Sequence, residues 1–329
     1  MIFRTAYNGY AAAFSPFYEN RIAIATAQNF GIIGNGRQYV LEYGPQGLKE
    51  LMAFDTADGL YDCAWCEDNE NVLVSASGDG SVKVWDLSVP PQMNPLRSFN
   101  EHSHEVYAVA WNLARRDCFV SASWDDTIKL WNLDAPGSLR TFAEHTYCIY
   151  AVTWNPQHAE VFASASGDNT VKIWDLRQPA STLTMAAHTY EILAADWNKY
   201  NDCILATGSV DKSVKIWDVR MPQQPLACML GHQYAVRRVK CSPHQENIVY
   251  TCSYDMTLRM WDWSHPQNAQ MIRTWDHHSV KRLSQYGLQA FCWIDRESLI
   301  MLALLRQDGI LSLDERCSRF NVDVGHHFS

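Results

Sequence analysis

The sequence predicts an all-β domain made of one repeated four-stranded sheet, and three observations support this prediction. Each of four His residues precedes an Asp by 23 residues, and that Asp precedes a Trp by 6. The link from each Trp to the next His varies, with spacings of 14, 14 and 15. Inside a unit, β-branched and small residues alternate around polar turns, as in β-hairpins. A constant unit with variable links and a period of about 44 residues is typical of the blades of a β-propeller. The sets are His102, Asp125 and Trp131; His145, Asp168 and Trp174; His188, Asp211 and Trp217; and His232, Asp255 and Trp261.

One unit illustrates the predicted strands. Residues 161–166 and 170–174 are β-branched and small-residue runs on either side of a polar Gly-Asp-Asn turn, which predicts a hairpin. Residues 149–154 form another alternating run, closed by Asn155 and Pro156. With one more strand in the linker, each unit becomes a four-stranded blade.

The recurring His and Asp are expected to be structural rather than catalytic. The His lies in the connection that enters each blade and the Asp in its central turn, so both should meet at one end of the sheet. The carboxylate can accept a hydrogen bond from the imidazole, and hydroxyl groups of the small-residue strand can continue the chain to the Trp N–H. A catalytic acid or base is needed once, whereas this set recurs in every blade. We therefore expect no catalytic residues and a protein that is not an enzyme.

The domain organisation follows from the repeats. Residues 1–313 should form a single seven-bladed propeller whose last blade is degenerate or altered, and residues 1–7 should complete that blade and close the ring. Residues 314–329 are polar and expected to be frayed. The blades are expected near residues 8–43, 56–87, 102–133, 145–176, 188–219, 232–263 and, irregularly, 278–313.

Three blades depart from the rule. In the first, the central hairpin is enlarged by residues 29–36, and Val40 stands where Trp is expected. In the second, Thr56 replaces His. After His278 the spacing rule requires an Asp and then a Trp, but the chain has Met301 and Gln307 at those two positions. This break predicts either a degenerate closing blade or a C-terminus from an alternative exon or a mispredicted gene, and its abruptness at Ser279 favours the second interpretation.

Composition excludes several classes. The net charge of -9 disfavours nucleic acid as a partner and favours a basic one. No apolar run approaches the roughly 18 residues that span a bilayer, and the N-terminus lacks the apolar core of a signal peptide. The ten cysteines are scattered, as in a reduced compartment. Cys63 and Cys66 match a C-x-x-C string without a second pair, so we expect no metal and no cofactor.

The Trp-Asp pairs that close the blades, at 85–86, 174–175, 217–218 and 261–262, with Trp131-Asn132, match the WD-repeat signature. Further loop and turn strings over about residues 2–278 resemble the WD-repeat peroxins, the receptors for the type 2 peroxisomal targeting signal. The repeat itself does not require these strings, which makes the resemblance specific. The strings are residues 8–10, 14–18, 27–31, 55–58, 123–127, 196–200, 234–237, 242–244 and 253–256.

This resemblance implies a non-enzymatic import receptor. Members of the family bind the N-terminal nonapeptide of newly made matrix proteins and carry them from the cytosol to the peroxisome, cycling to its membrane and matrix. The implied partners are these cargo proteins, a co-receptor (the receptor for the C-terminal signal, or an equivalent) and the docking complex at the peroxisomal membrane. An amphipathic helix would lay its apolar face on the ring while its Arg or Lys meets a carboxylate.

Candidate peptide-binding residues follow from position at the end of the ring that carries the incoming loops and central turns. Glu105 and Glu191 stand three residues after a His and could meet a basic side chain, as could acids near the Thr56 position. Tyrosines two residues after a His could form an aromatic rim, and large residues just before a turn Asp should be exposed. The alternative is that the acids only solubilise the protein and the tyrosines pack on neighbouring loops. The full set is Asp58, Asp62, Glu105, Trp124, Tyr147, Tyr190, Glu191, Tyr234 and Tyr254.

Two other functions are compatible with a propeller. Residues 174–177 and 217–220 fit the W-D-x-R string of substrate receptors of cullin-type ubiquitin ligases. A generic scaffold without a peptide site is the second alternative. A pull-down that recovers a ligase adaptor instead of a peroxisomal co-receptor would favour the ligase receptor.

Overall fold

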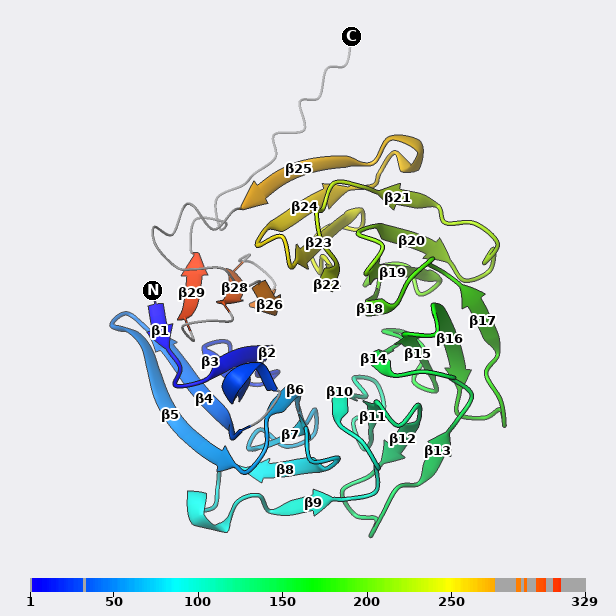
Figure 1. Ribbon diagram of the computed structural model, residues 1–329. Helices are drawn as coiled ribbons and strands as arrows, with labels where there is room; N and C mark the ends of the chain where they lie inside the picture. Colours follow the sequence, from blue (N-terminus) through cyan, green and yellow to red (C-terminus); the bar gives the residue numbers. More distant parts are fainter. Residues whose placement is uncertain are drawn as a thin grey trace.

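A computed structural model describes residues 2–31 and 34–275 of the chain and four short strands at 288–290, 293–294, 300–305 and 310–314. Seven antiparallel sheets are arranged in a ring, with the first strand of each regular blade nearest the centre (Figure 1). The chain is thus the seven-bladed, all-β propeller that the repeats predict. Residues 32–33, 276–287 and 315–329, with the expected start of the last blade at His278 and most of the expected frayed tail, lie outside the described residues.

Six sheets have four strands each, in sequence order from the centre outwards. The fourth strand lies in the linker between repeats, so each blade extends beyond the span of its His, Asp and Trp. The first three blades are β2 (Asn8–Phe14), β3 (Arg21–Ala27), β4 (Gly36–Gly44), β5 (Gly47–Thr56); β6 (Leu60–Trp65), β7 (Val72–Ser77), β8 (Val82–Asp86), β9 (Arg97–Phe99); and β10 (Val106–Trp111), β11 (Phe119–Ser123), β12 (Ile128–Trp131), β13 (Arg140–Phe142). The next three are β14 (Ile149–Trp154), β15 (Val161–Ser166), β16 (Thr170–Asp175), β17 (Leu183–Ala186); β18 (Ile192–Trp197), β19 (Ile204–Ser209), β20 (Val214–Asp218), β21 (Ala227–Met229); and β22 (Val236–Cys241), β23 (Ile248–Ser253), β24 (Leu258–Asp262), β25 (Gln270–Trp275).

The seventh sheet joins the two ends of the chain. The N-terminal strand β1 (Ile2–Arg4) pairs antiparallel with β29 (Ile310–Asp314), and the sheet continues through β28 (Ile300–Leu305) to β26 (Leu288–Ala290). A short strand β27 (Trp293–Ile294) also pairs with β28. Strand β26 contacts both β2 and β22, so this sheet lies between the sixth blade and the first.

The hydrophobic core lies between neighbouring blades rather than inside one. A representative cluster joins Val120 and Phe142 of the third blade to Trp154, Phe162 and Trp174 of the fourth. The second to fifth blades present apolar residues on both faces of the sheet, and each of them contributes to two such clusters. Short 3-10 helices lie outside the sheets, and among the described residues no helix has the length and apolar content of a membrane-spanning segment. These helices are η1 (Gln28–Gly31), η2 (Pro91–Met93) and η3 (Pro266–Asn268).

The first blade corrects one expectation. Trp174 pairs with Phe162 in the fourth blade, and the residue in the matching register of the first blade is Leu41, opposite Ile22, rather than Val40. The enlarged hairpin shifts the count by one, and sequence spacing alone could not reveal this. Leu41 packs with Ile22 and Ile24 in an apolar cluster, so an apolar side chain stands where the regular blades have Trp.

Candidate functional site

A hydrogen-bonded chain links the recurring residues in each regular blade. In the fourth blade, His145 Nδ1 lies 2.7 Å from Asp168 Oδ2, and His145 Nε2 lies 2.7 Å from Ser164 Oγ. The Trp174 Nε1–H group donates to the same Ser164 oxygen at 2.9 Å. Because the carboxylate can only accept, Nδ1 carries the proton, and in a neutral imidazole Nε2 accepts from the Ser164 hydroxyl. The equivalent hydroxyls in the third, fifth and sixth blades belong to Ser121, Thr207 and Thr251.

The pKa values fit a structural role for this network. Burial by itself would raise the pKa of Asp168, but hydrogen bonds from His145 and Thr170 bring it well below its usual value. Burial lowers the pKa of His188, which favours its neutral form. All four His side chains are fully buried, so no substrate could reach them. The same balance lowers the pKa of the other three turn aspartates, Asp125, Asp211 and Asp255.

Three tyrosines form an exposed rim at the end of the ring that carries the incoming loops and central turns. Tyr147, Tyr190 and Tyr234 are 50%, 61% and 62% exposed. Their backbone carbonyls accept hydrogen bonds from serine hydroxyls at the ends of the second strands, 2.8–3.2 Å long. The loops are therefore anchored while the rings remain in solvent. Exposed, rigidly mounted aromatic rings are well suited to binding a partner.

Four carboxylates, which we call the acidic arc, lie beside this rim on the second, third and fifth blades: Asp58, Glu105, Asp126 and Glu191. They lie close enough to two nearby groups to raise the pKa values of both. Burial raises the pKa of the Cys148 thiol, and Asp126, Glu191 and Glu105 raise it further. Burial also raises the pKa of Tyr61, with additional contributions from Asp58 and Glu105. The arc is therefore a negatively charged surface that favours a cation.

Three of the expected rim residues differ from the expectation: Asp62 lies elsewhere, and Trp124 and Tyr254 are not fully exposed. Asp62 is on the first strand of its blade and points into the ring, where it accepts hydrogen bonds from the Cys63 and Val109 N–H groups at 3.1 and 3.2 Å. Trp124 is half-buried rather than exposed, because its ring stacks on Tyr107 with centroids 5.5 Å apart. Tyr254, in the equivalent turn of the sixth blade, is also half-buried.

The sequence analysis missed a row of buried and half-buried aromatic rings below the rim. The centroids of Tyr10 and Tyr61 are 5.2 Å apart, those of Tyr61 and Tyr107 5.3 Å, and those of Tyr107 and Tyr150 5.5 Å. A signal was present, because Tyr61, Tyr107 and Tyr150 each stand five residues after Thr56 or a recurring His. Arg237 occupies this position in the sixth blade.

Arg237 crosses the ring beneath the rim. Its side chain is 1% exposed, its Nη2 donates to the Tyr107 hydroxyl at 2.8 Å, and its guanidinium lies 4.9 Å from the Tyr107 ring centroid. Tyr107 belongs to the third blade and Arg237 to the sixth, so this contact joins opposite sides of the ring. The tyrosine row and Arg237 together form a platform under the rim.

The remaining motifs give no second site of this kind. Cys63 and Cys66 are both buried, and burial raises the pKa of the Cys66 thiol. Across residues 2–31, 34–275 and the later strands, no three His, Cys, Asp or Glu side chains gather as metal ligands. In the W-D-x-R strings, Arg177 and Arg220 each pair with the Asp two residues before, Asp175 and Asp218, and their side chains are 70% and 66% exposed.

Sequence comparisons agree with this architecture. Residues 138–261 match the family described as EIPR1 beta-propeller, and residues 49–86 and 93–132 match the family described as WD domain, G-beta repeat. The chain is 55% identical over 110 residues to Peroxisome biogenesis protein 7 of Arabidopsis thaliana, which is 33% of this chain and 35% of the relative. It is 52% identical over 107 residues to the Peroxisomal targeting signal 2 receptor of Dictyostelium discoideum, covering 32% and 34%.

A segment of similar length matches the human relative. The chain is 46% identical over 102 residues to the Peroxisomal targeting signal 2 receptor of Homo sapiens, covering 31% of each protein. All three matches thus span about a third of the relatives' own length. The chain is a WD-repeat β-propeller, and about a third of it is similar in sequence to receptors for the type 2 peroxisomal targeting signal.

Proposed function

We propose that the chain is a non-enzymatic import receptor that binds the N-terminal type 2 targeting signal of peroxisomal matrix proteins. The observation that carries this proposal is the acidic arc beside three exposed tyrosines on one rim of the propeller. The similarity of about a third of the chain to targeting signal 2 receptors supports it. This rim presents the variable side chains of several blades around one face, which suits recognition of a short peptide.

The peptide would bind as an amphipathic helix. Its apolar face would lie on Tyr147, Tyr190 and Tyr234, which offer aromatic area without a large loss of side-chain freedom. Its Arg or Lys would meet Glu105 or Glu191, which are half-buried and therefore less screened by solvent than fully exposed acids. A charge-assisted hydrogen bond of this kind contributes about 1.5–3 kcal/mol. The platform below would hold the rim rigid as the peptide docks.

The partners and location extend the same proposal. We propose that a co-receptor, either the receptor for the C-terminal signal or an equivalent, binds together with the cargo. The complex would meet the docking complex at the peroxisomal membrane, and the receptor would cycle between the cytosol and the peroxisome. The net charge of -9 is compatible with a basic targeting peptide.

A direct binding experiment tests the proposal. A fluorescent nonapeptide signal is titrated with the full chain, with and without the co-receptor, and polarisation is measured. Glu105→Lys and Glu191→Lys should each weaken binding by about 1–3 kcal/mol, roughly fivefold to more than a hundredfold. Glu50→Lys, which changes an exposed acid on the outer strand β5, is the matched control and should leave the affinity unchanged. Wild-type affinity in both rim variants would remove these acids from the binding surface.

A further inference from the structure

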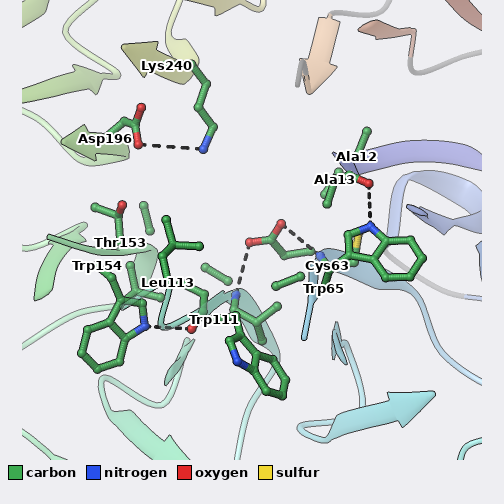
Figure 2. Close-up of a pocket in the computed structure, with 18 of the residues that line it drawn as sticks. Ala12, Ala13, Cys63, Trp65, Trp111, Leu113, Thr153, Trp154, Asp196 and Lys240 are labelled. Carbon is green, nitrogen blue, oxygen red and sulfur yellow. Dashed lines mark hydrogen bonds and ion pairs between the residues drawn. The ribbon is translucent and has the colours of Figure 1, made fainter. Parts of the chain in front are cut away.

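A cavity lies inside the ring, on the side away from the rim. It has a volume of about 430 Å³ and is lined by the first strands of the first six blades (Figure 2). Leu113 and Pro156, from loops that follow first strands, also line it, so it opens at the end of the ring opposite the tyrosines. Alanines at matching positions, Ala11, Ala108 and Ala151, leave room in the centre. The size is in the range of small-molecule sites.

A β-bulge brings two consecutive arginines to this part of the molecule. The pairing of β22 with β23 shifts register between Val236 and Arg238, so Arg237 is the extra residue of a bulge. Arg237 lies in the platform below the rim, while Arg238 lines the cavity. The corresponding residues of the third and fourth blades are Ala108 and Ala151, so the sixth blade places a cation where they place a methyl group.

The Arg238 guanidinium is incompletely paired. Its Nη2 is buried, and no hydrogen-bond acceptor for it exists among the described residues. The carboxylate of Asp62 lies 3.7 Å away, beyond hydrogen-bond distance, and already accepts from the backbone of Cys63 and Val109. A buried donor without an acceptor costs about 1–3 kcal/mol, which a bound anion would recover.

A second cation points into the same space. Figure 2 shows the Lys240 side chain extending from its strand towards the opening, opposite Asp196. Its Nζ is 4.0 Å from Asp196 Oδ1, whereas Asp196 is already satisfied by Lys199 Nζ at 2.9 Å and the Cys241 N–H at 2.8 Å. This ion pair is too long for a hydrogen bond, so the Lys240 ammonium can still donate to a ligand in the cavity. The remaining lining acid is Glu67, whose pKa is raised by burial.

We propose that this cavity binds the phosphate group of a small molecule, with Arg238 and Lys240 donating to its oxygens. Arg238 and Lys240 stand two residues apart on β22 and therefore on the same face of the strand, so they can contact separate oxygens of one phosphate or of a diphosphate. The alanine walls would accommodate the rest of the ligand. The cavity and the rim lie at opposite ends of the ring, so this proposal does not depend on peptide binding.

Isothermal titration of pyrophosphate into the full chain, in a buffer without phosphate, tests the assignment. Wild-type protein should bind it, and Lys240→Gln should weaken binding at least tenfold. Because the Lys240 side chain is 41% exposed, this variant should fold normally. Lys49→Gln on the outer strand β5, which removes an equal charge from an exposed position, should bind like the wild type. No binding by the wild type at millimolar pyrophosphate, or equal loss in both variants, would overturn the proposal.

Discussion

Substitution of Ser164 by Ala should strongly destabilise the propeller, and the structure allows the effect to be estimated. The Ser164 hydroxyl is fully buried and is the partner of both His145 Nε2 and Trp174 Nε1. Its removal leaves two buried polar groups without a partner. Each such group costs about 1–3 kcal/mol, so the free energy of unfolding should fall by roughly 2–6 kcal/mol.

The assay is urea unfolding followed by tryptophan fluorescence, with two companion variants. Ser164→Thr restores the hydroxyl, and threonine already serves at this position in the fifth and sixth blades as Thr207 and Thr251. This variant should therefore recover most of the lost stability. Ser264→Ala removes an exposed hydroxyl and should change the unfolding free energy by less than about 0.5 kcal/mol. The network would be refuted if Ser164→Ala kept its free energy of unfolding within about 0.5 kcal/mol of wild type, or if Ser164→Thr were destabilised as much as Ser164→Ala.

Three further predictions concern stability. In the folded protein the turn aspartates have pKa values below the usual value near 3.8, and burial lowers the pKa of His188. The stability that these groups contribute is therefore complete at neutral pH and is lost on acidification. The urea midpoint should therefore fall as pH drops below about 6.5 and more steeply below about 4, whereas a flat profile to about pH 3 would contradict this. Tyr107→Phe should cost about 1–3 kcal/mol in urea unfolding, because Arg237 loses its hydroxyl acceptor, and an unchanged midpoint would show that the contact is unimportant. Gly36→Ala should destabilise the protein by about 1–3 kcal/mol, because a Cβ there would overlap the backbone carbonyl of Asp58. Gly44→Ala is the control, since a Cβ there has no atom within 4 Å, and it should not destabilise the protein. Equal urea midpoints for the two variants would contradict the close approach at Gly36.

Much of the fold could be predicted because the repeat unit encodes local geometry. The fixed separation of His145 from Asp168 is the distance in sequence between an incoming loop and a central turn. Only the paired strands β14 and β15 lie between the two residues, so their hydrogen bond depends on local pairing. The first blade could not be predicted to the residue, because its enlarged hairpin changes the register and places Leu41 where Val40 was expected. Spacing specifies a position only while the turn length is constant.

The candidate site was less predictable because it depends on contacts between blades. Exposed positions such as Tyr190 and Tyr234 follow from their place in the incoming loop. The stacking of Trp124 on Tyr107 and the contact of Arg237 with the opposite side of the ring involve residues distant in the chain. No local pattern specifies which side chains meet at the centre of a closed ring.

Reversal of charge on both partners tests the central claim most directly. The nonapeptide and a variant with Glu in place of its basic residue are titrated by polarisation against the wild type and the Glu105→Lys, Glu191→Lys double variant, each with co-receptor. We predict that the double variant binds the native peptide weakly and the charge-reversed peptide more tightly than the wild type does, with a coupling energy of about 1–3 kcal/mol. Equal affinity of both receptors for both peptides would contradict it.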